Sequence, residues 1–547
     1  MRLFTKIQMR LLFCFLVSAI SAYPQNPPPQ INIPGPTLSS AQWQADLQFL
    51  SENMQRQHPN PFRRVPKADF DSAVKTLNDR IPSASVEEIL AGFMRIVAMV
   101  KDGHTGMFPA EYFRSGVFPV RFYLFEDGLY IQKAAPQYAA LAGAKVIKIG
   151  NLNAMDAYKR VSALAAADNE MGVRENAPLF LSIPEMLIGT GIIESKQDLK
   201  LVLETGGKQQ TTNLKPAYSV NDLIRTPADW TDAAAKKPLY LQHTDDNYWF
   251  EYLKDDKIVY VQQNAVVNKQ DETVAAFYER VIKFIDANPV DKLVIDLRRN
   301  DGGNNGLNRP VVISLIKSKI NERGKLFVIT GRMTFSAAQN FVNEIEKYTN
   351  ATFVGEPTAG RPNHYGDGRS VTLPNSRLNI QISTLYWQDM DPRDNRQWTA
   401  PQVAAPLTAT DYSKGGDPAL QAIIKYKPQR SLREIAMELF QANDLKSFRA
   451  KALEFKNNPM NVYQSIEADI NTFGYRLVNM KKMDEAIDMF KLNTELYPGS
   501  ANAFDSLGEA YANQGNREEA IKSYEKALKI DPAFASSVEA LRKLKGN

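Results

Sequence analysis

Residues 292–342 read KLVIDLRRNDGGNNGLNRPVVISLIKSKINERGKLFVITGRMTFSAAQNFV, and this stretch alternates strand and helix patterns. Apolar runs at 292–297 and 325–330 predict two strands, a helical pattern at about 308–319 lies between them, and another helix begins at Ser336. Strands that alternate with helices of about 10 to 15 residues indicate an α/β layer. We therefore expect a sheet that is at least partly parallel.

The sequence before this stretch divides into three parts. A strand at 258–263 and a helix at about 271–287 extend the α/β pattern towards the N-terminus. Residues 117–217 predict a separate β-rich module of short strands with Gly and Asp turns, and a helical insertion interrupts it over about 165–190. Helical patterns fill 40–116.

The C-terminal segment repeats itself with a period of 34 residues. The positions that match are Gly474 and Gly508, Ala486 and Ala520, Ile487 and Ile521, Phe490 and Tyr524, and Pro498 and Pro532. This period predicts two tetratricopeptide-like helical hairpins and a closing helix within 465–545. Because two repeats bury little surface alone, the helical stretch 431–457 of the connector 431–464 is expected to pack under them.

The N-terminus has the pattern of an export signal. Three basic residues and no acid occupy the first ten positions, and the apolar run LLFCFLVSAISA ends at Ala22. The run is shorter than the ~20 residues that a transmembrane helix needs, so residues 1–22 are predicted to be a secretory signal peptide, with an uncleaved anchor as the alternative. Cys14 is the only cysteine, so the mature chain would have no thiol. Residues 23–39 form a Pro-rich linker, and we expect a periplasmic or secreted protein.

The composition is that of a globular, multidomain chain. With 547 residues, of which 44% are hydrophobic and 23% charged, it excludes a collagen-like, low-complexity or largely disordered protein. The net charge is +5, and it is +2 without the three basic residues of the first ten positions. The charge therefore gives no indication of a nucleic-acid partner.

Among the four histidines, His104 is the best candidate for chemistry. It lies in a Gly-flanked turn, DGHTG at 102–106, directly after an amphipathic helix whose start is marked by Ser85 and Glu88. His58, which precedes a proline at a helix end, is interpreted as structural, and His243 as a solvated linker residue.

Two further segments carry candidate chemistry. Ser336 stands where a strand turns into a helix, which is how α/β hydrolases present a nucleophile; the alternative is that it is only a helix N-cap. The polar loop DLRRNDGGNN at 296–305 contains Gly302 and Gly303, which can aim backbone N–H groups at an oxyanion; the alternative is a tight turn.

Four motifs in one order then carry a family resemblance. They are DGHT at 102–105, VIDLRRNDGG at 294–303, TFSAA at 334–338 and GEPTAG at 355–360. Over about residues 40–425 the chain resembles the tail-specific, or C-terminal processing, serine peptidases, and within them the tricorn-like branch with a Ser–His pair. The β-rich module stands where this family carries a PDZ-like domain.

The resemblance implies catalytic roles for named residues. Ser336 would be the nucleophile and His104 the general base, with the N–H groups of Gly302 or Gly303 and of Ala337 as oxyanion donors. One branch of the family uses a lysine after the serine helix, but no lysine occurs between Lys347 and Lys414. A histidine with a pKa near ~6.5 can accept the serine proton at neutral pH.

The acid that would orient the base is less well marked. In the tricorn-like branch it precedes a stretch that appears here as WTAPQV at 398–403, and no Glu lies there. Asp394 is the nearest carboxylate and the first choice, with Asp391 and Asp389 as fallbacks. His364 is the second choice for the base.

These observations predict an α/β multidomain protein. A crotonase-like α/β peptidase core at 218–430 would follow the N-terminal helices and the inserted PDZ-like domain, and tetratricopeptide-like repeats would end the chain. We expect a serine endopeptidase that acts through an acyl-enzyme on unfolded or tail-exposed proteins, without metal or cofactor. Its repeats would bind a protein partner, and no membrane span would remain after signal cleavage. The rival hypothesis is a non-catalytic binding scaffold on the same fold, and the separation of Ser336 and His104 discriminates between the two.

Overall fold

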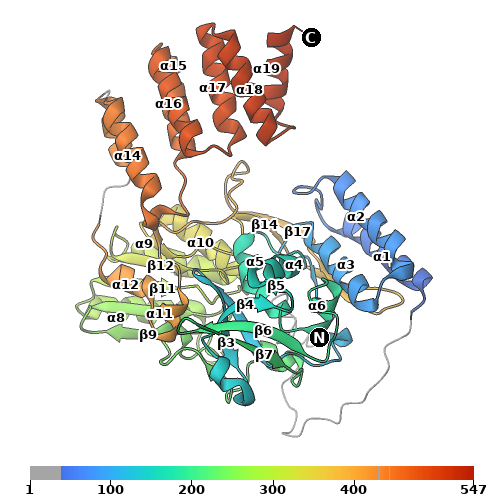
Figure 1. Cartoon of the computed structure of the whole chain (residues 1–547). Coiled ribbons are helices and arrows are strands. Elements are labelled where there is room, and N and C mark those ends of the chain that lie inside the picture. Colours follow the sequence, from blue (N-terminus) through green and yellow to red (C-terminus); the bar gives the residue numbers. More distant parts are fainter. Residues whose placement is uncertain (1–37, 429–431, 443, 547) are drawn as a thin grey trace, which may run out of the picture. The chain divides into compact units, whose positions relative to one another are not determined.

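The computed structural model describes residues 38–428, 432–442 and 444–546 (Figure 1). The predicted signal peptide and nearly all of the Pro-rich linker lie outside these residues. Contacts divide the chain into two compact units. The larger unit contains the chain up to Pro401 together with Ala405–Tyr426, and the smaller unit contains Gln402–Ala404 and the chain from Lys427 onwards.

Three helices begin the larger unit: α1 (Ser40–Gln57), α2 (Lys67–Arg80) and α3 (Val86–Ala98). A capping box starts α3, because the Ser85 hydroxyl accepts from the N–H of Glu88 while the Glu88 carboxylate accepts from the N–H of Ser85. The apolar stripe of α3 is buried, and the helix gives way to a turn in which Lys101 has a φ of 54°. The segment that contains His104 follows directly after this turn.

The β-rich module is an antiparallel sheet with helices inserted into it. Its main strands, in spatial order, are β2 (Val120–Phe125), β3 (Gly128–Ala134), β4 (Lys145–Ile149), β6 (Leu199–Thr205) and β7 (Lys208–Leu214). The short strands β5 (Leu152–Asn153) and β8 (Thr231–Asp232) pair with β4 and β3. Between β5 and β6 the chain forms α4 (Ala154–Ser162), α5 (Glu170–Phe180) and α6 (Pro184–Gly189), where a helical insertion is expected. The likeness of this module to PDZ domains stays a prediction.

A second sheet forms the centre of the α/β core. The strands β10 (Ile258–Gln263), β11 (Lys292–Asp296), β12 (Leu326–Thr330) and β13 (Thr352–Gly355) pair in parallel, and β9 (Tyr248–Leu253) adds an antiparallel strand beside β10. The connections contain α8 (Val274–Ala287), α9 (Asn308–Lys317) and α10 (Ala337–Tyr348). Strands β10 and β12 are buried along their whole length, as strands covered on both faces must be.

Parallel pairing brings the carboxyl ends of these strands to one edge of the sheet. Ile295 of β11 lies opposite Val328 of β12, so the loops that follow the two strands leave the sheet side by side. The second and third predicted motifs lie on these two loops.

Short strands and helices complete the larger unit. They are β1 (Gly106–Met107), β14 (Asn363–Gly366), β15 (Arg369–Thr372), β16 (Asn379–Ile382), β17 (Leu385–Gln388), α7 (Val220–Ile224), α11 (Ala409–Ser413) and α12 (Pro418–Ile424). Strand β1, directly after His104, pairs antiparallel with β16, and β14 pairs antiparallel with β17. The pairing of β1 with β16 ties the histidine segment to the chain after α10.

The smaller unit is helical. Its helices are α13 (Leu432–Gln441), α14 (Leu445–Asn457), α15 (Glu467–Asn479), α16 (Met483–Leu496), α17 (Ala501–Gln514), α18 (Arg517–Ile530) and α19 (Ala535–Lys545). Phe448 of α14 lies in one apolar cluster with α15 and α16, and its ring is 5.3 Å from that of Phe473. Helix α14 therefore packs against the first hairpin.

The repeated glycines of this unit are needed for close helix packing. A Cβ atom at Gly474 of α15 would lie 2.5 Å from the buried ring of Phe490, and one at Gly508 would lie 2.9 Å from the ring of Tyr524. Each glycine thus lets an aromatic ring of the following helix approach the backbone, which explains why both recur with the repeat.

We predict that Gly474→Ala destabilises the smaller unit by roughly 1–3 kcal/mol, because overpacking against Phe490 outweighs the gain of about 1 kcal/mol in helix propensity. Urea unfolding of the full chain, followed by circular dichroism, measures the change. Gly499→Ala is the matched control, since a Cβ there meets nothing within 4 Å. Equal unfolding midpoints for the two variants would contradict the packing argument.

Candidate active site

Ser336 stands on a strained turn between β12 and α10. Its φ of 54° and ψ of −126° place a non-glycine residue in a region that such residues rarely adopt. It occupies the N-cap position of α10, but its hydroxyl makes no capping hydrogen bond to that helix. The hydroxyl lies instead 2.9 Å from Nε2 of His104. This turn has the geometry of a nucleophile elbow.

The loop after β11 lies against this turn. A Cβ atom at Gly302 would stand 2.7 Å from Cβ of Ser336, so only glycine allows this approach. Both Gly302, with a φ of 116°, and Gly303, with a φ of 141°, adopt backbone angles that favour glycine. Thr334 and Phe335 fasten the two loops together, because the Thr334 hydroxyl donates to the carbonyl of Leu297 and the Phe335 N–H to that of Asn300.

The three predicted oxyanion donors differ in their hydrogen bonding. The N–H of Gly302 donates to Oδ1 of Asn300 at 3.0 Å. Within the described part of the chain, the N–H groups of Gly303 and Ala337 make no hydrogen bond to another residue. Gly303 and Ala337 are therefore the pair that can receive a developing negative charge.

His104 is held between two aromatic rings. Its imidazole stacks on Phe335 with 4.3 Å between ring centroids, and the parallel ring of His364 lies 5.7 Å away on β14. His364 itself turns Nδ1 towards the carbonyl of Arg361. The structure thus brings His104, and not the second-choice base His364, into hydrogen-bond contact with Ser336.

Several groups act on the pKa of His104. Burial, the largest effect, lowers the pKa below its ordinary value, and the negative charge of Asp102 opposes this shift. His364 lowers the pKa further, whereas Asp168 and Asp367 raise it. A lowered pKa keeps the imidazole neutral, and so able to accept a proton, at and below neutral pH.

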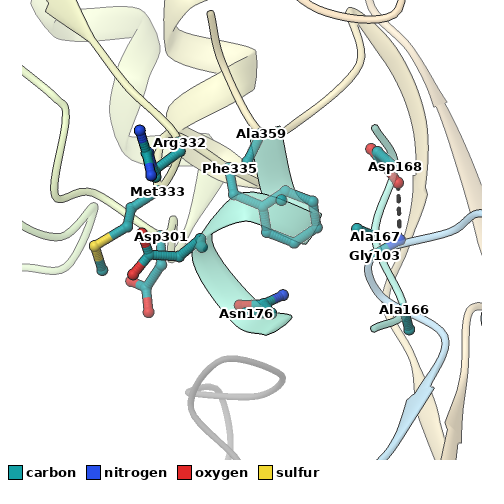
Figure 2. A pocket seen from close by; sticks show the side chains of 12 residues that line it. Gly103, Ala166, Ala167, Asp168, Asn176, Asp301, Arg332, Met333, Phe335 and Ala359 are labelled. Carbon is teal, nitrogen blue, oxygen red and sulfur yellow. Dashed lines mark hydrogen bonds between the residues drawn. The ribbon is translucent and has the colours of Figure 1, made fainter. Parts of the chain in front are cut away.

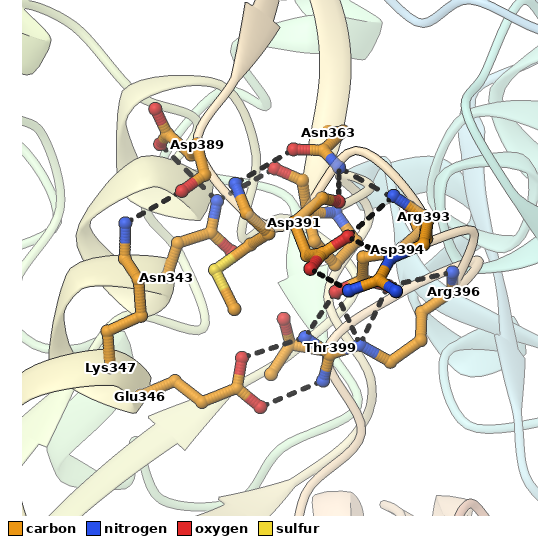
Figure 3. A network of polar contacts seen from close by, with 12 residues as sticks. Asn343, Glu346, Lys347, Asn363, Asp389, Asp391, Arg393, Asp394, Arg396 and Thr399 are labelled. Atoms are coloured by element: carbon orange, nitrogen blue, oxygen red, sulfur yellow. Dashed lines mark hydrogen bonds and ion pairs between the residues drawn. The ribbon is translucent and has the colours of Figure 1, made fainter. Parts of the chain in front are cut away.

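Asp394 does not lie at this histidine. Its carboxylate accepts from the N–H of Arg396 at 3.0 Å and from the guanidinium of the same residue at 2.8 Å (Figure 3). Arg396 in turn binds Glu346 of α10 through two hydrogen bonds. The carboxylate is thus used to fasten a loop to α10, and the prediction that it orients the base is not supported by this geometry.

The two fallback acids also serve the loop and not the histidine. Asp391 pairs with exposed Arg393, and Asp389 accepts from the amide groups of Asn340 and Asn343 on α10 (Figure 3). Within the described residues, Nδ1 of His104 is buried and has no hydrogen-bond partner. Among the described residues, none of the three predicted acids contacts the base, and the assignment of a third catalytic residue stays a prediction.

Sequence reasoning missed three residues that surround the base. Asp102 belongs to the quoted DGHT motif, yet nothing in the motif assigns it a partner. His58, read as structural, places Nε2 3.1 Å from the Asp102 carboxylate. Asp168 accepts from the N–H of Gly103 at 2.8 Å although 65 positions separate the two residues. No sequence signal reports such a contact, because it exists only after the β-rich module has folded.

A cavity adjoins the same loops. Its lining includes Gly103, Asp301 and Phe335, which directly precede the base, the Gly-Gly pair and the nucleophile (Figure 2). Residues of the helical insertion, among them Asp168 and Asn176, also line the cavity, and Asp168 lies beside Gly103. The insertion therefore contributes to the surroundings of the candidate active site.

Comparison with solved structures identifies the fold. The structure of mature CPAF complexed with lactacystin aligns with a TM-score of 0.51 and 12% identity, covering 71% of this chain and 98% of that one. The photosystem II D1 C-terminal processing protease (TM-score 0.34, 12% identity, 70% of this chain and 96% of that one) is also similar. The tricorn protease is similar as well, with a TM-score of 0.34 and 14% identity over 70% of this chain and 36% of that one.

The CPAF alignment confirms the predicted fold class: over 71% of its length the chain shares the fold of mature CPAF. At 12% identity, this likeness concerns the fold alone. A tetratricopeptide repeat family model matches residues 501–534, which contain α17 and α18, and confirms the second of the two predicted repeats. No curated protein sequence matches the chain significantly. Among the described helices, none is both long enough and apolar enough to span a bilayer.

We predict that His104 titrates below about 6.5 and that His364→Gln raises its pKa, because the substitution removes a nearby imidazole that disfavours the charged form. NMR of ¹³C-labelled histidine follows the titration, and four histidines make assignment by single substitutions practical. A His104 pKa that falls or stays the same in His364→Gln would contradict the electrostatic description.

Proposed function

We propose that this protein is a serine peptidase that hydrolyses peptide bonds through an acyl-enzyme on Ser336. The observation that carries the proposal is the 2.9 Å separation between Ser336 Oγ and His104 Nε2. Nucleophile and base within hydrogen-bond reach are the signature of activated serine chemistry. A binding scaffold would need neither this contact nor the strained backbone of Ser336.

The acylation step follows from the geometry. The hydroxyl of Ser336 donates its proton to Nε2 of His104 while Oγ attacks the carbonyl carbon of the scissile bond. The N–H groups of Gly303 and Ala337 stabilise the oxyanion that forms, and removal of one such donor typically slows turnover ~100 to 1000-fold.

The remaining steps reverse the proton transfer. The imidazolium of His104 gives the proton to the leaving amine, the C–N bond breaks, and the acyl group stays on Ser336. A water molecule then attacks the ester, again with His104 as the base. Products are two shorter peptides and the free enzyme.

The substrate class follows from the appended parts. Substrates are unfolded or tail-exposed protein chains, since the β-rich module adjoins the candidate active site and tetratricopeptide-like repeats commonly bind protein segments. The N-terminal signal pattern supports export, and we propose that the enzyme works in the periplasm or outside the cell.

We predict that the chain without residues 1–22 digests casein, and that Ser336→Ala and His104→Ala each reduce cleavage by about 10³-fold or more. Mass spectrometry of the products measures cleavage. Asp394→Asn is the matched control, because Asp394 binds Arg396 and lies away from the base; it should retain activity within about tenfold.

Three outcomes separate the hypotheses. Loss in both alanine variants with retention in the control supports a Ser–His peptidase without Asp394. Loss in Asp394→Asn, in a variant that is still folded, would restore Asp394 as a catalytic acid. No cleavage by the parent, together with no labelling of Ser336 by a fluorophosphonate, would favour the scaffold.

A further inference from the structure

The base of the proposed reaction has no acid at its second ring nitrogen. For Nε2 of His104 to accept the Ser336 proton, the proton of the neutral ring must lie on Nδ1. In serine peptidases a carboxylate commonly binds this N–H and fixes both the tautomer and the ring orientation. Here Nδ1 is buried and without a partner among the described residues, and the whole residue is only 5% exposed. Other contacts must therefore fix the orientation of the His104 imidazole.

Asp102 binds the backbone N–H of His104, the proposed base. Its Oδ1 accepts from the N–H of His104 at 2.9 Å, and its Oδ2 accepts from the hydroxyl of Thr105 at 2.5 Å. Nε2 of His58 lies 3.1 Å from the same oxygen. Because Nδ1 of His58 accepts from the N–H of Asn60, the neutral His58 carries its proton on Nε2 and donates it to Asp102.

Asp102 is a buried carboxylate that remains ionised. Burial alone would raise its pKa, but the hydrogen bond from His58 and the electrostatic effect of His104 hold the pKa well below its usual range. A buried negative charge next to the imidazole stabilises the imidazolium that forms during catalysis, even without contact at Nδ1.

Asp168 binds the backbone N–H of Gly103, the residue before His104. Its Oδ1 accepts from the N–H of Gly103 at 2.8 Å (Figure 2). Its Oδ2 accepts from the N–H of Arg361 at 3.1 Å. The guanidinium of Arg361 donates to the carbonyl of Asp168 at 2.9 Å. One buried carboxylate thus joins the histidine loop to the segment after the GEPTAG motif.

The insertion that carries Asp168 is itself fixed to the core. The amide of Asn169 donates to the carbonyls of Thr358 at 3.1 Å and Gln397 at 2.7 Å, while its side-chain oxygen caps α5. Asp168 and Asn169 therefore form a rigid contact between the β-rich module and the α/β core.

We infer that Asp102 and Asp168 are positioning residues that hold His104 through its loop backbone and supply the negative charge that an acid at Nδ1 provides in other serine peptidases. This inference deepens the proposed function and rests on it. The two carboxylates bind the loop backbone at Gly103 and His104, and the rings of Phe335 and His364 stack against the imidazole. The charged and titratable groups that act on His104 are Asp102, His364, Asp168 and Asp367.

The test uses Asp168→Asn in the full chain without residues 1–22. The substitution keeps the size of the side chain but removes its charge and one acceptor. We expect kcat to fall about 10- to 100-fold, because the base is no longer correctly placed. KM should change less than about threefold, because the substitution leaves substrate binding intact. The acid limb of the pH–kcat/KM profile moves to lower pH, because loss of the negative charge disfavours the imidazolium. Asp198→Asn, an exposed aspartate of the same module, is the matched control and leaves both unchanged.

Two results would overturn the inference: an unchanged kcat in Asp168→Asn, or a loss of activity with an unmoved acid limb. If the variant does not fold, Arg361→Ala replaces it, because this change removes the guanidinium that fixes Asp168 but leaves the backbone N–H. It should lower kcat by less than Asp168→Asn does, whereas the acid limb moves to higher pH, because the lost cation no longer disfavours the imidazolium. An unchanged kcat in this variant would also overturn the inference.

NMR titration of His104 separates this inference from the proposed function, since it needs no turnover. A lower His104 pKa in Asp168→Asn supports the electrostatic role even if no substrate is cleaved. An inactive parent that shows this shift would remove the peptidase proposal alone. An active parent whose His104 pKa does not respond to Asp168→Asn would remove the positioning role alone.

Discussion

At the candidate active site, the loop after β11 and the turn before α10 approach each other so closely that a side chain at position 302 would overlap Ser336. This approach depends on the parallel register of β11 and β12, which makes the two loops leave the sheet at the same edge. It also depends on the unusual backbone angles of Ser336, which turn its hydroxyl away from α10 and towards His104. The strain of such a conformation, about 1–3 kcal/mol, persists only where surrounding hydrogen bonds impose it, and Thr334 and Phe335 provide these bonds.

The loop after β11 starts from a buried charge cluster. Arg298 binds Asp296 at the end of the strand and makes two hydrogen bonds to Asp417, the N-cap of α12. Tyr260 of β10 donates to the same Asp296 at 2.7 Å. Buried charges are costly unless they are paired, and this pairing sets the path of the chain towards Gly302. The stability of the core and the geometry of the candidate oxyanion donors thus have a common origin.

Three parts of the larger unit meet at one histidine. The base comes from the turn after α3, the nucleophile from the start of α10, and Asp168 from the insertion of the β-rich module. In such an arrangement the module is part of the candidate active site and not only an attached binding domain.

Periodicity and local motifs determined much of this protein. The alternation within 292–342 predicted the α/β layer, the capping signal at Ser85 predicted α3, and the period of 34 residues predicted the helical repeats, because each pattern depends on neighbours in the sequence. The motifs also singled out Ser336 and His104, which the structure brings into contact. The role of Asp394 stays a prediction: its carboxylate binds Arg396 in this structure, and proximity to a family motif in the sequence does not show which way a side chain points. Only the tertiary structure decided that Asp168 binds the backbone of Gly103, the residue before the base, since contacts between residues so far apart in the chain depend on how separately folded elements pack together.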